Sequence, residues 1–173
     1  EVLPFTVPAG QTVTANLTIV RASGNTPSKV KFIVFRGELG FNEYTNGSST
    51  IVGQPNANGA ITLGAVNYTS TPAFNPAPFN PPVQNFSSRG GTEVNGTVRN
   101  KPNLVAPNGG NTTVALGAPN VDGDAFPNFF GTSAAAPHAA GVGALLKQGK
   151  MKFYNQVLSP ASIKTILQST ALD

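Results

Sequence analysis

The alternation of hydrophobic and polar residues predicts a β-rich segment at the start of the chain. From Thr12 to Ile19 apolar residues alternate with threonine and asparagine, which is the two-residue period of a strand with one buried face. The run from Val30 to Phe35 is β-branched and aromatic, and turns are predicted at Gly10 and at Ser23–Pro27. We therefore predict a sandwich-like β segment over residues 1–45, which is too small to be stable alone.

From Ala60 the pattern changes to that of an α/β domain, after a Gly/Asn/Ser stretch from Asn42 to Gly59 that predicts a loop. Ile61–Val66 and Leu104–Ala106 are short runs of small and branched apolar residues, typical of strands buried on both faces of a parallel sheet. A helix is predicted from Thr132 or Ser133 to Lys147. A second helix is predicted to begin with Ser159 as its N-cap and Pro160 at the first helical position. Residues 46–173 are thus expected to form an α/β unit with a mostly parallel sheet.

Composition narrows the class of protein. The chain has 173 residues, of which 19 are glycine, 15 are proline and only 10% are charged, so we expect many loops and few surface ion pairs. The net charge of +4 is not gathered into a basic stripe, which argues against a nucleic-acid partner, and no run of residues suggests a membrane partner. There is no cysteine, which excludes disulfides and cysteine-bearing zinc sites. Low charge, many Asn and Thr residues and no cysteine favour a secreted protein.

One serine is placed as a nucleophile would be. The segment reads Gly131-Thr-Ser-Ala-Ala-Ala-Pro-His-Ala-Ala-Gly141, so that Ser133 lies between a glycine turn and small apolar residues at a helix start. We expect Pro137 to fall in the first turn of that helix, where its missing amide proton costs little. A helix N-terminus has unpaired amides and a positive dipole end, which suit an oxyanion. This geometry alone fits a nucleophile and a plain helix cap equally well.

The chain does not contain a complete set of partners for Ser133. A serine needs a base, usually a histidine that a carboxylate orients. The sole histidine is His138, which on a helix lies about 140° around the axis from Ser133 and points away from it. Seven acidic residues are present, but no second histidine exists for any of them to orient. No Ser-His-acid constellation can be assembled from these residues.

Four segments, in order, resemble the subtilisin-like serine proteases. Besides the serine segment, they are Ile61-Thr-Leu-Gly-Ala-Val-Asn67, Asn85-Phe-Ser-Ser-Arg-Gly90 and Lys101-Pro-Asn-Leu-Val-Ala-Pro107. The resemblance covers about residues 60 to 173 and implies part of the family's three-layer α/β fold and a polypeptide substrate. Asn103 stands where Asp is common in the family, and Asn108 stands where Gly often follows Ala-Pro.

The resemblance also implies the roles of individual residues. The family's chain order is Asp, His, Ser, so the chain is expected to be the C-terminal, serine-bearing part of a catalytic domain whose Asp and His lie before Glu1, and to be inactive alone. Ser133 is then the nucleophile, and its own amide, supported by Thr132 and Gly131, contributes to the oxyanion hole. The family's oxyanion asparagine stays unassigned, with Asn42 and Asn46 as the nearer candidates. Residues 1–45 are expected to be the end of an inserted accessory module, and His138 to be structural.

Other functions are also considered. A non-catalytic pseudoprotease or a β-rich binding or adhesion module is the alternative function, while a lipase-like hydrolase is disfavoured because the Gly-X-Ser-X-Gly elbow is absent.

The chemistry is expected to need no cofactor. Asp122-Gly-Asp124 has the alternate carboxylates of a calcium loop but too few ligands after it, so an ordinary turn is favoured over structural calcium. Phe126, Phe129 and Phe130 are expected to pack under the serine loop.

Overall fold

The computed structural model describes residues 3–34, 40–41, 43, 49–76, 81–114, 117 and 119–172. The chain divides into two compact units, Glu1–Leu39 and Gly40–Asp173. Each unit is described by itself.

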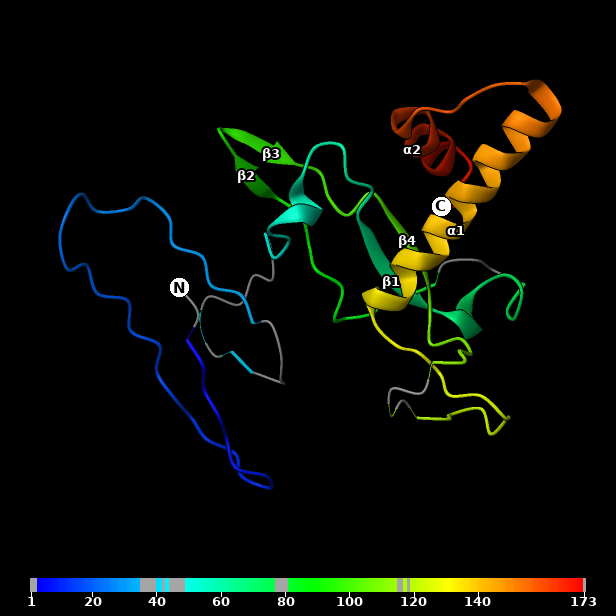
Figure 1. The fold of residues 1–173 in the computed structure, drawn as a ribbon. Helices are drawn as coiled ribbons and strands as arrows, with labels where there is room; N and C mark the ends of the chain where they lie inside the picture. Colours follow the sequence, from blue (N-terminus) through cyan, green and yellow to red (C-terminus); the bar gives the residue numbers. More distant parts are fainter. Residues whose placement is uncertain are drawn as a thin grey trace. The chain divides into compact units, whose positions relative to one another are not determined.

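The predicted strands are not formed in residues 3–34, the described part of the first unit. Residues 3–34 contain turns and extended loop but no strand (Figure 1, blue). The two turns do form: Gln11 N donates to Pro8 O (3.1 Å) around Gly10, and Arg21 Nη1 donates to Gly24 O (3.2 Å). The alternating apolar side chains stay exposed, by 48% at Val13 and 59% at Ile19. A segment with alternating apolar residues forms a strand only where a neighbouring strand pairs with it and its apolar face packs against other residues. These described residues have neither.

The second unit has mixed α/β content with a parallel strand pair, as predicted. Its strands and helices, in chain order, are η1 (Gln54–Asn56), β1 (Leu63–Asn67), η2 (Tyr68–Ser70), β2 (Thr92–Val94), β3 (Thr97–Arg99), β4 (Leu104–Asn108), α1 (Thr132–Tyr154) and α2 (Pro160–Ser169). β1 and β4 pair in parallel from Leu63↔Leu104 to Asn67↔Asn108, while β2 and β3 form a small antiparallel hairpin.

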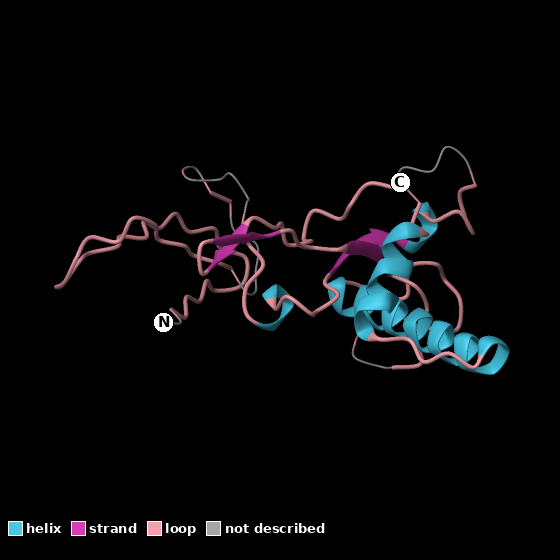
Figure 2. Ribbon diagram, turned by 90° about the horizontal axis from the view of Figure 1, so that it is seen from above, coloured by secondary structure: helices cyan, strands magenta, loops and turns pink. Residues whose placement is uncertain are grey.

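Alanines join α1 to the parallel pair. Ala134 and Ala135 at the start of α1 are buried, and Ala135 forms the core with Ala65 of β1 and Ala106 of β4. Because these side chains are small on both sides, the helix backbone lies close to the sheet (Figure 1; Figure 2 gives the view from above). This contact fixes the first turn of α1 against the middle of β1 and β4.

Helix α1 differs from its prediction at two points. It continues seven residues past Lys147 to Tyr154 and ends where Asn155 takes the left-handed conformation, with its N–H bonded to Met151 O at 3.1 Å. Lys150, Met151 and Lys152 are good helix formers, so Gly149 does not end the helix. Since α1 begins at Thr132, Pro137 lies in its second turn and not in its first, and the carbonyl of Ser133 receives no bond from the residue four positions on. Helix α2 begins as predicted, with Ser159 Oγ accepting from Ser162 N at 3.1 Å.

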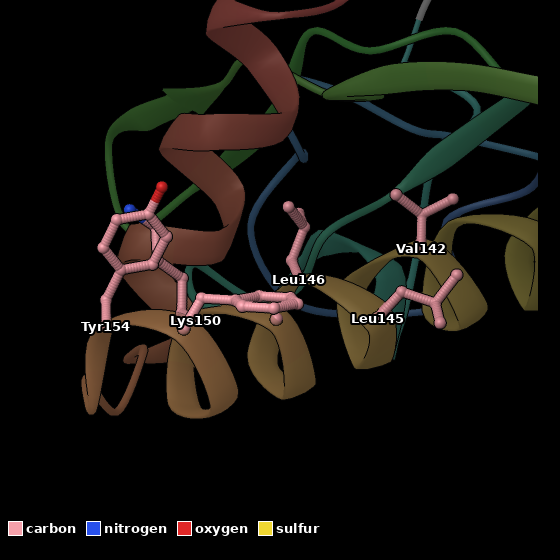
Figure 3. A pocket seen from close by; sticks show the side chains of 7 residues that line it. Val142, Leu145, Leu146, Lys150 and Tyr154 are labelled. Carbon is pink, nitrogen blue, oxygen red and sulfur yellow. The ribbon is translucent and has the colours of Figure 1, made fainter.

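Much of the apolar surface of α1 and of the sheet is uncovered. Leu145, Phe153 and Tyr154 are 66%, 72% and 65% exposed, and seven residues of α1 from Val142 to Tyr154 line an open groove of about 340 Å³ (Figure 3). Val105 of β4 is 42% exposed, so the predicted burial of both sheet faces is not reached in the described chain.

Among the described helices, none is both long enough and apolar enough to cross a membrane.

Candidate functional site

Ser133 lies in the first turn of α1 and its side chain is exposed. Thr132 is the first helical residue and Gly131 is the N-cap, with φ 109° and ψ 170°. Gly131 O accepts from Ala134 N (3.0 Å) and Ala135 N (3.3 Å), which closes the first turn. The amides of Thr132 and Ser133 precede these and have no carbonyl within the helix to bond. The arrangement therefore places a hydroxyl and an amide donor together at the positive end of a 23-residue helix.

The conformation of Gly131 explains why the segment begins with glycine. A φ of 109° with ψ near 170° is a region that essentially only glycine occupies. A Cβ at this position would meet only Ser133 N, at 3.7 Å, so backbone strain and not crowding sets the constraint.

Replacing Gly131 with alanine is expected to lower the free energy of unfolding by about 1–3 kcal/mol, because alanine is strained at these angles. Denaturant unfolding of the full-length protein measures the loss. Gly149→Ala is the control, since Gly149 lies within α1 with nothing within 4 Å of the added Cβ, and there alanine is expected to stabilise by up to about 1 kcal/mol. Equal stability of G131A and wild type would contradict the strain at the N-cap.

A buried asparagine supports this N-cap from the sheet. Asn108, the last residue of β4, is 1% exposed. Its Nδ2 donates to Val66 O of β1 at 2.7 Å, and its Oδ1 accepts from Gly131 N at 3.2 Å. In the sequence this residue was notable only as a departure from the resemblance, because no local signal reveals a side chain that bonds to residues 42 and 23 positions away.

The loop before Ser133 is held by a second buried asparagine. Asn128 is 0% exposed and its Nδ2 donates to Gly109 O at 2.9 Å, while Gly109 N donates to Phe129 O at 2.8 Å. The aromatic prediction holds only in part, since Phe129 is half-buried but Phe126 and Phe130 are 45% and 38% exposed. Phe130 lies against Gly109, where an added Cβ would come within 2.7 Å of its ring.

Asp122 and Asp124 belong to a hydrogen-bonded loop. Asp122 Oδ2 accepts from Asn128 Nδ2 and from Tyr68 Oη, both at 3.1 Å, and Asp124 Oδ1 accepts from Phe126 N at 2.6 Å. The bond from Asn128 is the main reason that the pKa of Asp122 lies below its usual value. Within the part of the chain that the structure describes, no three His, Cys, Asp or Glu side chains are grouped as a metal ion would need.

His138 is engaged by its own helix. Its Nδ1 lies 2.8 Å from the carbonyl oxygen of Ala134, four residues earlier, and donates to it because a carbonyl only accepts. This bond holds the ring against the preceding turn of α1. Asn42 and Asn46, the candidates for the oxyanion asparagine, lie outside the described residues.

In comparisons with known proteins, this chain is similar to subtilisin-like proteases. The model of the family described as the subtilase family matches residues 8–173. Subtilisin-like protease SBT2.3 of Arabidopsis thaliana is 36% identical over 100 residues, covering 53% of this chain and 11% of its own length. Subtilisin-like protease SBT2.2 of the same plant is 42% identical over 76 residues, covering 42% of this chain and 8% of its own length. The chain therefore spans about a tenth of the length of these curated relatives. No solved structure gives a significant match.

Proposed function

Because this chain belongs to the subtilase family, we propose that it carries Ser133 as the nucleophile of a serine endopeptidase that cleaves polypeptides. The observation that carries the proposal is the placement of Ser133: its side chain is exposed in the first turn of α1, two residues after the glycine N-cap. The relatives are named as proteases, and the serine segment is one of the four that resemble the family.

In the proposed reaction Ser133 Oγ attacks the carbonyl carbon of the scissile peptide bond, while its proton passes to an imidazole base. The carbonyl oxygen becomes an oxyanion, which the Ser133 amide at the helix start stabilises by a hydrogen bond. Collapse of this intermediate expels the amine, which takes the proton from the imidazolium, and leaves an acyl group on Ser133. Water then hydrolyses the ester by the same steps. No cofactor takes part in this scheme.

The base and the carboxylate that orients it are proposed to come from outside this chain. His138 is the sole histidine of the sequence, and its Nδ1 is bonded to Ala134 O within α1. We assign it a structural role for that reason. The partner of this chain is then the remainder of the same catalytic domain, and the uncovered apolar side chains of α1, such as Leu145 and Phe153, are consistent with such a partner.

The N-terminal segment and the location of the protein are also proposals. We propose that residues 1–45 end an accessory module inserted into the catalytic domain, supported by the separate compact unit that ends at Leu39. The family model begins at residue 8 and so extends over most of this segment. An extracellular location is supported by the low charge and the absence of cysteine.

Peptidase assays on two matched preparations test the proposal. The full-length protein that contains this chain is expected to cleave an unstructured polypeptide such as casein, and this chain alone is expected to show no cleavage because the base is missing. Rapid cleavage by the chain alone would place the base within it and overturn the assignment of His138. Absence of cleavage by the full-length protein would favour the non-catalytic alternative, a pseudoprotease or binding module.

A further inference from the structure

Asn108 stands out among the residues around Ser133 because its side chain is buried and bonded in two directions. Asn108 and Asn128 are the largest fully buried side chains among the described residues. A buried amide is costly unless its polar atoms have partners. Asn108 meets this requirement by bridging two backbone segments, at Val66 and Gly131, that lie far apart in the sequence.

The two bonds of Asn108 link three elements at one point. Nδ2 donates to Val66 O near the end of β1, and Oδ1 accepts from Gly131 N at the start of α1. Asn108 itself closes β4, paired in register with Asn67. The amide that receives this support is two residues before Ser133, at the one backbone position of the segment with glycine-only angles.

Gly131 has no side chain to cap the helix, and no side-chain cap bond is made from it. The orientation of the peptide group before Gly131 is therefore fixed from outside the helix, by the Oδ1 of Asn108 at 3.2 Å. That peptide group sets the direction in which the chain enters α1, and hence where the hydroxyl and amide of Ser133 lie.

We propose that Asn108 is a positioning residue for catalysis, which holds the Gly131–Ser133 backbone in the conformation that presents Ser133 to the substrate. This inference rests on the proposed function. Glycine, which often follows Ala-Pro in the resembling segment of the family, would supply neither bond. An aspartate would accept from Gly131 N but would face the Val66 carbonyl without a proton to donate.

Asn103 supplies a matched control at the other end of the same strands. It immediately precedes β4, and its Oδ1 accepts from Thr62 N at 3.0 Å and from Lys101 Nζ at 3.0 Å. Like Asn108, it is an asparagine that ties the β1 side of the sheet to the β4 side. It lies five residues from Asn108, which along a strand is about 16 Å, and it makes no bond to the serine segment.

The test compares N108A, N108D and N103A in the full-length protein by kcat, KM and melting temperature. A misplacement of about 1 Å can cost about 100-fold in rate, so N108A is expected to lower kcat by about 10- to 100-fold with KM changed less than about twofold. N108D, which retains the acceptor for Gly131 N, is expected to recover part of that loss. N103A is expected to lower the melting temperature as N108A does but to leave kcat within about twofold of wild type. Equal kcat in N108A and N103A at similar stability would overturn the positioning role.

Hydrogen exchange separates a failure of this inference from a failure of the proposed function. Mass spectrometry of the peptide that contains Gly131 is expected to show slow exchange of its amide in wild type and N103A, and fast exchange in N108A. If the wild-type protein has no peptidase activity, the endopeptidase proposal fails, and the positioning role in catalysis fails with it. The exchange result still decides whether Asn108 holds the Gly131 amide. Unchanged exchange in N108A would overturn that structural link in either case.

Discussion

Replacing Ser133 with alanine in the full-length protein is expected to lower kcat by about 10⁶-fold, the loss known for subtilisin, a member of the same family, when its serine is removed. Without the hydroxyl no acyl-enzyme forms, and only water activated in the remaining site attacks the substrate. The side chain is exposed and lies in the first turn of α1, so the substitution removes little packing and the melting temperature is expected to stay close to that of wild type. The kcat of S133A on a peptide substrate, with its melting curve, checks both expectations.

His138→Gln is the matched control for this prediction. The variant removes the only imidazole of the chain, five residues from Ser133 on the same helix. If the base comes from elsewhere, as proposed, H138Q retains kcat within a few-fold of wild type. A loss in H138Q as large as that in S133A would make His138 the base and contradict the account.

Gly90→Ala is expected to have the largest effect on stability. A Cβ on Gly90 would lie 1.8 Å from the carbonyl oxygen of Lys101 and 2.9 Å from its carbonyl carbon. Both are backbone atoms next to β4, and Lys101 is itself buried, with its Nζ bonded to Asn103 Oδ1. The backbone must therefore move, and we expect a loss of about 3 kcal/mol or more in the free energy of unfolding. Chemical denaturation of the full-length protein measures it.

Gly59→Ala provides the comparison. Gly59 has an ordinary φ and nothing within 4 Å of an added Cβ, so alanine there is expected to change stability by less than about 0.5 kcal/mol. If G90A and G59A unfolded at the same denaturant concentration, the close approach of Gly90 to Lys101 would be wrong.

The elements that the sequence predicts well are those whose signals are local. Ser159 followed by Pro160 marks the start of α2, and the small apolar residues of β1 and β4 indicate a parallel pair. The hairpin of β2 and β3 also carried a local signal that was missed: Asn95-Gly96 joins the two strands with both residues at positive φ.

The predictions that failed depended on distant contacts. The alternating segment from Thr12 to Ile19 has the pattern of a strand, but a strand forms only with a partner, and in residues 3–34 none is formed. The predicted end of α1 at Lys147 was also wrong, because the helix continues to Tyr154 and ends at Asn155 in the left-handed conformation.

In the candidate site, too, the residues with a local sequence signal were predicted and those that depend on distant contacts were not. Ser133 and the glycine before it were recognisable because the motif is contiguous, and the small residues after it allow the close packing of α1 on the sheet. Asn108 was not recognisable, since its role follows from bonds to Val66 and Gly131 that only the folded chain brings within reach.

The most direct test of the account is to treat the full-length protein with a fluorophosphonate, which reacts with activated serine hydroxyls, and to map the adduct by peptide mass spectrometry. The account predicts a single adduct on Ser133 that is absent in S133A. An adduct on another serine, or none on a protein that cleaves peptides, would contradict the assignment of Ser133 as the nucleophile.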